Sequence, residues 1–113
     1  MSKSTKSITG YHAHVYYDAD NKKIAERLRR RVKTQFNINL GRWHDNPIGP
    51  HPKGMYQIEF RADIFSSLVT WMVFNRDDLS ILVHPLTGDD LADHTSYSMW
   101  LGESLKLRLS KIS

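Results

Sequence analysis

A chain of 113 residues, of which 40% are hydrophobic and 25% charged, has the composition of one globular domain with a single core. No apolar run approaches the ~20 residues that span a bilayer, and the absence of cysteine excludes disulfides, thiolate zinc sites, iron–sulfur clusters and a thiol nucleophile. Much of the net charge of +4 comes from the segment Lys22 to Lys33, so this charge favours solubility over any particular partner.

The first ten residues, MSKSTKSITG, are polar and contain no apolar stretch typical of a secretory signal. We expect residues 1–10 to form a disordered tail and residues 11–113 to form a single domain. We expect the protein to be cytoplasmic.

The first half of the domain predicts a strand, a helix and a weaker strand. Residues 11–17 have the composition of a strand. Ile24, Leu28 and Val32 then recur at every fourth position against basic side chains, which predicts an amphipathic helix ending near Asn37. Residues 38–43 alternate only loosely. Residues 44–54, HDNPIGPHPKG, hold three prolines and two glycines, which predict a stiff loop.

The second half predicts a strand over residues 55–60, a helix over 64–72 and a strand over 79–84. The order β-α-β-β-α-β is the ferredoxin-like plan, an α+β fold in which two helices cover one face of an antiparallel sheet. Residues 91–100 predict loop and turn. Residues 105–109 alternate and predict an extra C-terminal strand.

Side-chain alternation assigns the histidines of the strands to one face. In the first strand His12, His14 and Tyr16 lie opposite the apolar Ala13 and Val15. The same reasoning leaves three further polar side chains on the helix-free face of the later strands: Gln57, Glu59 and His84.

In the usual ferredoxin-like strand order, 4-1-3-2, Glu59 and His84 flank the histidine pair at ~5 Å. This spacing predicts a metal site with His12, His14, His84 and Glu59 as ligands, a donor set suited to iron(II) or zinc. The competing interpretation is that these histidines are solvated or hydrogen-bonded surface side chains, and that Glu59 is a surface charge.

The loops contribute further candidates. His51 lies between two prolines in a stiff loop, which presents a side chain with little ordering cost. His94 follows an acidic stretch and is a candidate acid or base, because an imidazole titrates near neutral pH. The competing interpretation is that His51 and His94 are exposed side chains with a structural role only, and that Lys53 is a solvated charge of the loop. An aromatic pocket is predicted from four side chains: Tyr16, Trp43, Tyr97 and Trp100.

Three segments in this order, YHAHVYY, GPHPKGMYQIEF and LVHPLTGDDLADHT followed by WLG, resemble the DOPA 4,5-dioxygenase family over residues 11–109. The resemblance implies a non-haem iron(II) enzyme that uses dioxygen to open a catechol ring beside its two hydroxyls. The histidine motifs of the family fall on five positions of this chain: His12, His14, His51, His84 and His94.

The resemblance does not say which of these histidines bind the metal. The face assignment favours His12, His14 and His84 with Glu59, which leaves His51 and His94 as catalytic acid–base groups. The reverse assignment, with His51 or His94 as a ligand, stays open. Lys53 and Tyr16 are the predicted substrate-binding residues, with Lys53 holding the carboxylate of a DOPA-like catechol.

We therefore expect an iron-dependent extradiol dioxygenase acting on DOPA or a related catechol with O2, in which zinc or another divalent metal can replace iron in a purified sample. We expect a homodimer with no nucleic-acid or membrane partner, because an open sheet face needs a cover that excludes water. Either a second subunit or residues 89–113 can supply this cover. One alternative is a non-catalytic metal- or small-molecule-binding ferredoxin-like domain. An RNA-binding module is least supported, because the open face carries histidines instead of aromatic platforms.

Overall fold

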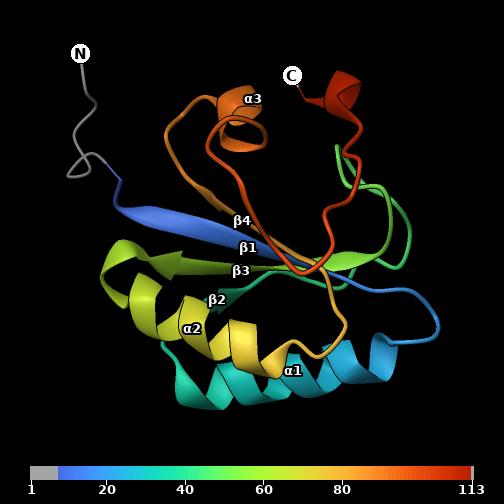
Figure 1. The fold of residues 1–113 in the computed structure, drawn as a ribbon, viewed down its shortest axis with the longest axis vertical. Coiled ribbons are helices and arrows are strands. Elements are labelled where there is room, and N and C mark those ends of the chain that lie inside the picture. Colours follow the sequence, from blue (N-terminus) through green and yellow to red (C-terminus); the bar gives the residue numbers. More distant parts are fainter. Residues whose placement is uncertain (1–7, 113) are drawn as a thin grey trace.

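The computed structural model describes residues 8–112 and folds into a five-stranded sheet with helices on one side (Figure 1). In chain order the elements are β1 (Gly10–Tyr16), α1 (Lys22–Gln35), β2 (Asn39–Leu40), β3 (Met55–Arg61), a 3₁₀ turn (Ala62–Ile64), α2 (Phe65–Asn75), β4 (Ile81–Pro85), α3 (Asp90–Asp93), β5 (Met99–Leu101) and a second 3₁₀ turn (Leu109–Lys111).

The sheet has the strand order β2-β3-β1-β4-β5, and every neighbouring pair is antiparallel. The first four strands therefore follow the predicted 4-1-3-2 order, and the ferredoxin-like α+β fold with an added strand is confirmed. Residues 1–7 of the predicted tail lie outside the described residues, and Gly10 already belongs to β1. In the part of the chain that the structure describes, no helix is both long and apolar enough to cross a bilayer.

The added strand is not at residues 105–109, so that placement was wrong. β5 pairs with the outer edge of β4 and comes from the segment predicted to be loop. Because β5 occupies this edge, residues 105–108 have no strand to pair with and run extended across the sheet face. The alternation still has a structural role, because Leu105 and Leu107 point to the same side and both pack against the apolar side chains of that face.

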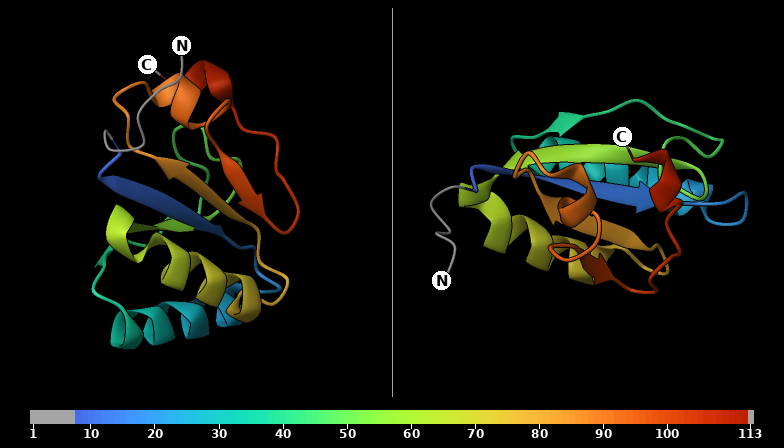
Figure 2. Two further views of the ribbon diagram at one scale, coloured as in Figure 1. Left: turned by 60° about the vertical axis from the view of Figure 1, so that its left-hand side comes forward. Right: turned by 90° about the horizontal axis from the view of Figure 1, so that it is seen from above.

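The two long helices cover one face of the sheet, and the main core lies between them and the strands (Figures 1 and 2). On α1 the buried side chains are Ala25, Leu28 and Val32, the apolar stripe expected from the sequence. The strands contribute their alternate residues, among them Ala13, Val15, Tyr56, Ile58, Ile81 and Val83. The predicted faces of the strands are confirmed by this core.

The opposite face is partly covered by the same chain. A small cluster of Tyr16, Met55 and Leu82 lies there, and Trp100, Leu105 and Leu107 pack over it. The short helix α3 and the C-terminal segment lie on this side, away from α1 and α2 (Figure 2). On this face His14 and His84 are buried, whereas His12 and Glu59 are partly exposed.

The two long helices start without side-chain caps. Asn21 is the N-cap of α1, but its side-chain oxygen accepts the backbone N–H of Asp18 instead of one from the helix. Asp63 lies inside the 3₁₀ turn before α2 and does not cap that helix.

Candidate metal centre

The sheet register brings the predicted strand residues together. His12 of β1 lies opposite Glu59 of β3 on one side and His84 of β4 on the other. His14 lies two residues further along the same face, opposite Gln57 and Leu82. Because β1 is the central strand, its histidines can contact both neighbouring strands.

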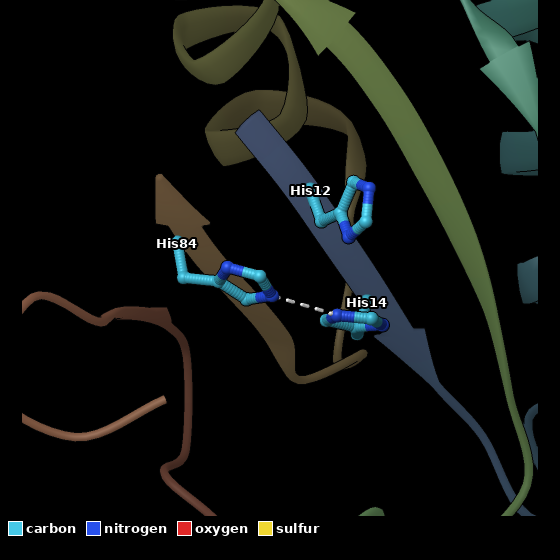
Figure 3. Close-up of side chains that lie close together, drawn as sticks. All are labelled: His12, His14 and His84. Atoms are coloured by element: carbon cyan, nitrogen blue, oxygen red, sulfur yellow. Dashed lines mark hydrogen bonds between the residues drawn. The ribbon is translucent and has the colours of Figure 1, made fainter. Parts of the chain in front are cut away.

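Five imidazoles converge on this face. One group consists of His12, His14 and His84, and a second consists of His14, His51 and His94; within each group, one ligand atom per residue lies within 4.8 Å of the others. The first group is the predicted trio, which comes from the adjacent strands β1 and β4 (Figure 3). The second adds the residues predicted from the loops. His14 belongs to both groups, so it is the centre of the cluster.

Backbone carbonyls fix the orientation of two of these rings. His84 donates its Nδ1–H to the carbonyl oxygen of Pro85 at 2.8 Å, and His94 donates its Nδ1–H to that of Asp90 at 2.7 Å. In the neutral ring, Nε2 then carries a lone pair. A ring nitrogen whose partner N–H is held by a carbonyl is the arrangement that metal-binding histidines use.

His14 gives the test of whether an ion fits. Its Nε2 lies 3.0 Å from the Nε2 of His84 (Figure 3). Its Nδ1 is buried without a hydrogen-bond partner among the described residues. Two nitrogens bound to one ion at about 2.1 Å and at a right angle to each other lie about 3.0 Å apart. The spacing of the two Nε2 atoms therefore fits a divalent ion held by imidazoles.

Glu59 supports His12 and does not join the group of potential ligands. Its carboxylate accepts a hydrogen bond from His12 Nε2 at 2.9 Å, and its side chain is 47% exposed. It belongs to neither histidine group. A neutral His12 that donates Nε2–H keeps its lone pair on Nδ1, which is the arrangement in which a carboxylate orients a metal-binding ring.

Tyr16 contacts the histidine cluster, whereas Lys53 pairs with a carboxylate in a turn. Tyr16 is fully buried, its hydroxyl is 2.7 Å from Nδ1 of His51, and its ring stacks on Trp100 at 5.7 Å between centroids. It therefore holds the His51 ring in place. The ammonium of Lys53 lies 3.5 Å from the Asp18 carboxylate, in the turn that follows β1. The structure does not bring Lys53 to the histidine cluster.

Burial keeps the central imidazoles neutral. It is the main reason that the pKa of His14 lies well below its usual 6.5, and repulsion from the other four histidines of the cluster adds to it. Burial, followed by repulsion from neighbouring imidazoles, lowers the pKa of His51 to about 4. The pKa of His84 is lowered by burial to about 4 as well, although the hydrogen bond to Pro85 opposes this change. Neutral rings can bind a metal without first losing a proton.

A groove of about 320 Å³ opens beside the cluster. Its described lining residues are His94, Thr95, Ser98, Trp100, Leu105, Lys106, Leu107 and Leu109. Sequence analysis missed Lys106, although the alternation over residues 105–109 places this lysine opposite the leucines. Of the four predicted pocket aromatics, Trp100 lines the groove, whereas Trp43 packs against Tyr17 and Tyr56 on the helix side of the sheet.

A ferredoxin-like sheet whose covered face gathers five imidazoles beside a groove defines a small α+β protein with a candidate histidine metal centre. The sequence model of the Dopa 4,5-dioxygenase family matches residues 11–111. The chain therefore belongs to the Dopa 4,5-dioxygenase family, in agreement with the resemblance of its histidine segments.

Individual relatives agree with this assignment. The chain is 36% identical to a DOPA 4,5-dioxygenase from Amanita muscaria, over 93% of this chain and 50% of the relative. It is also 36% identical to an uncharacterized 21.2 kDa protein from Botryotinia fuckeliana, over 90% of this chain and 62% of the relative. The chain thus spans about half to three-fifths of the length of these curated relatives.

A solved structure from Nostoc punctiforme, described as "a putative dioxygenase", is similar over almost the whole chain. The TM-score is 0.97 at 49% sequence identity, with 98% of this chain and 96% of the other covered. The fold described above is therefore shared with a bacterial relative of nearly the same length.

Proposed function

We propose that the protein is an iron(II)-dependent extradiol dioxygenase that opens the ring of DOPA or a related catechol with O2. The observation that carries the proposal is the convergence of five imidazoles in one cluster, three of them buried, with a groove beside it. The family to which the chain belongs, and the relative named DOPA 4,5-dioxygenase, support the same chemistry.

We assign the metal to His12, His14 and His84. They come from adjacent strands of a rigid sheet, and rigid elements hold ligands more precisely than loops do. Bound there, iron(II) would supply a common binding centre for the catechol oxygens and dioxygen, which removes most of the entropy cost of bringing them together. Three imidazoles leave further positions of such an ion open.

We assign proton transfer to His94. It lines the groove, and its Nδ1–H is already donated to Asp90, so its Nε2 is the atom that can accept a catechol proton. Burial lowers the pKa of His51 to about 4, so His51 is a weak base. Fixed by Tyr16 through Nδ1, His51 instead offers its Nε2 to groups bound in the cluster.

Single histidine substitutions test which group binds the metal. His14→Gln should abolish iron(II) or zinc binding under either assignment, whereas His12→Gln and His84→Gln should do so only if the strand trio is the site. His51→Gln and His94→Gln should retain a stoichiometric metal and lose oxygen uptake with catechols. His44→Gln is the matched control, because His44 belongs to neither group.

The measurements are metal content after anaerobic loading and dialysis, oxygen consumption with DOPA, and the absorbance of the ring-opened product. Loss of metal from the His51 or His94 variant with retention in the His12 variant would move the site to the second group. A bound metal without oxygen consumption for any catechol would contradict the proposed activity and indicate a non-catalytic metal-binding domain.

We also retain the homodimer in the cytoplasm as a proposal. Trp100, Leu105 and Leu107 of the same chain already cover part of this face, which leaves less of it for a partner subunit to cover. Sedimentation equilibrium at micromolar concentration distinguishes the dimer from a monomer.

A further inference from the structure

The groove beside His94 has an unbalanced charge. Lys106 is its cation, and no acidic side chain is found among the described residues that line it. The nearby Asp93 is buried, and its carboxylate is occupied by the backbone N–H and the hydroxyl of Thr87. Glu59 is occupied by His12. The groove therefore offers a partner to an anionic group and none to a cationic group.

Lys106 sits on a segment that is anchored on both sides. Leu105 and Leu107 pack against the cluster of Tyr16, Met55 and Leu82. The backbone N–H of Arg108 donates to Pro50 at 2.8 Å, and its guanidinium donates to the carbonyl of Gly49 at 3.1 Å. The backbone that carries Lys106 is thus held against the loop that carries His51.

The groove also contains an aromatic side chain that is held in place. Trp100 lines the groove and stacks on the buried Tyr16. Arg108 adds positive charge at this end, since its repulsion contributes to the lowered pKa of His51. An aromatic wall, a lysine and a histidine of the cluster together suit a planar ring that carries an anionic arm.

We infer that the groove selects catechols whose side chain carries a carboxylate and no ammonium, with the ring against Trp100 and the carboxylate on Lys106. This inference rests on the proposed function. It narrows the substrate to aryl-alkanoic or aryl-alkenoic acids, such as 3,4-dihydroxyphenylacetate and caffeate. The ammonium group of DOPA or dopamine would lose its hydrating water on entering the groove and would find no carboxylate there as a partner. Binding of both compounds is therefore disfavoured.

Binding to the metal-free protein tests the groove without any turnover. The probes are 4-hydroxyphenylacetate, tyrosine and tyramine, which have one ring hydroxyl and differ in side-chain charge. Affinity is read from the indole N–H resonance of Trp100 in a nitrogen-15 spectrum. We expect 4-hydroxyphenylacetate to bind at least tenfold more tightly than tyramine, with tyrosine in between.

Lys106→Gln should weaken 4-hydroxyphenylacetate binding at least fivefold and leave tyramine unchanged. Lys111→Gln removes the same charge from an exposed position nearby that does not line the groove, and it should change neither affinity. Equal affinities for the three probes, or equal effects of the two substitutions, would overturn the inference.

Turnover provides the second test, with the iron-loaded protein. The ratio of kcat/KM for 3,4-dihydroxyphenylacetate to that for dopamine should exceed ten and should fall below one in Lys106→Glu. An unchanged ratio in an active variant refutes the inference while the proposed function stands. Lys106-dependent binding without oxygen uptake for any catechol refutes the proposed function and leaves the groove as an aromatic carboxylate site.

Discussion

Lowering the pH from 7.5 to 4.5 should strongly destabilise the metal-free protein. His51 and His84 have pKa values of about 4 in the folded chain, against an ordinary 6.5. Between these values the unfolded chain binds more protons, so the free energy of unfolding rises with pH. This stability is complete above pH 6.5 and is lost as the pH falls toward 4.

The magnitude follows from the two values. Each histidine contributes about 3 kcal/mol, with a slope of up to about 1.4 kcal/mol per pH unit. Adding the two contributions counts the repulsion between the histidines of the cluster more than once. We therefore expect the free energy of unfolding to change by on the order of 4 kcal/mol for the pair. His14 adds to it in the same direction. A domain of this size is typically stable by about 5–15 kcal/mol, so the loss is a large part of the total.

Urea denaturation of the metal-free protein at half-unit pH intervals measures this dependence. His84→Gln should reduce the slope by roughly a third to a half, whatever its effect on absolute stability, since one of the coupled sites is gone. His44→Gln should leave the slope nearly unchanged. A free energy of unfolding that is constant within about 1 kcal/mol from pH 7.5 to 4.5 would refute the burial argument for the cluster.

Three further changes test individual contacts. Glu59→Gln should weaken metal binding by about 10- to 100-fold with little change in stability, measured by competition with a chromophoric chelator; an unchanged affinity would make Glu59 a surface charge. Tyr16→Phe should cost about 1–3 kcal/mol in urea denaturation, because it leaves a buried nitrogen of His51 without its partner; equal stability would mean that water replaces the hydroxyl. Gly102→Ala should cost about 1–2 kcal/mol, since Gly102 has φ +81° and a Cβ there would meet the Arg76 side chain; a melting temperature equal to that of the unaltered protein would contradict this.

The strand part of the site could be predicted from the sequence because it depends only on alternation and strand order. Once Ala13 and Val15 are assigned to the core, His12 and His14 must face the other way, and the ferredoxin-like order places His84 beside them. The register of β1 with β3 and β4 confirms this reasoning. The alternation of side chains in strands thus predicts that His14 and His84, seventy residues apart in sequence, lie close together, even when no loop conformation is known.

The sequence marks His51 and His94 as candidates, but their positions relative to the strands could not be predicted, because these depend on contacts between distant segments. The Tyr16 hydroxyl contacts His51, 35 residues further along the chain, and the segment that carries Lys106 is anchored to the proline loop through Arg108. Alternation over residues 105–109 predicts a strand, but an extended segment packed on a sheet face has the same pattern. Only the presence of β5 at the sheet edge distinguishes these two outcomes.

The two outermost strands of the sheet, β2 and β5, are two and three residues long. Such short edge strands expose few unpaired N–H and C=O groups, which disfavours strand pairing with another polypeptide. A self-association of this chain should therefore use side chains of helices or loops, and a continuous sheet across two copies is not expected. The same brevity protects the fold against strand-by-strand aggregation.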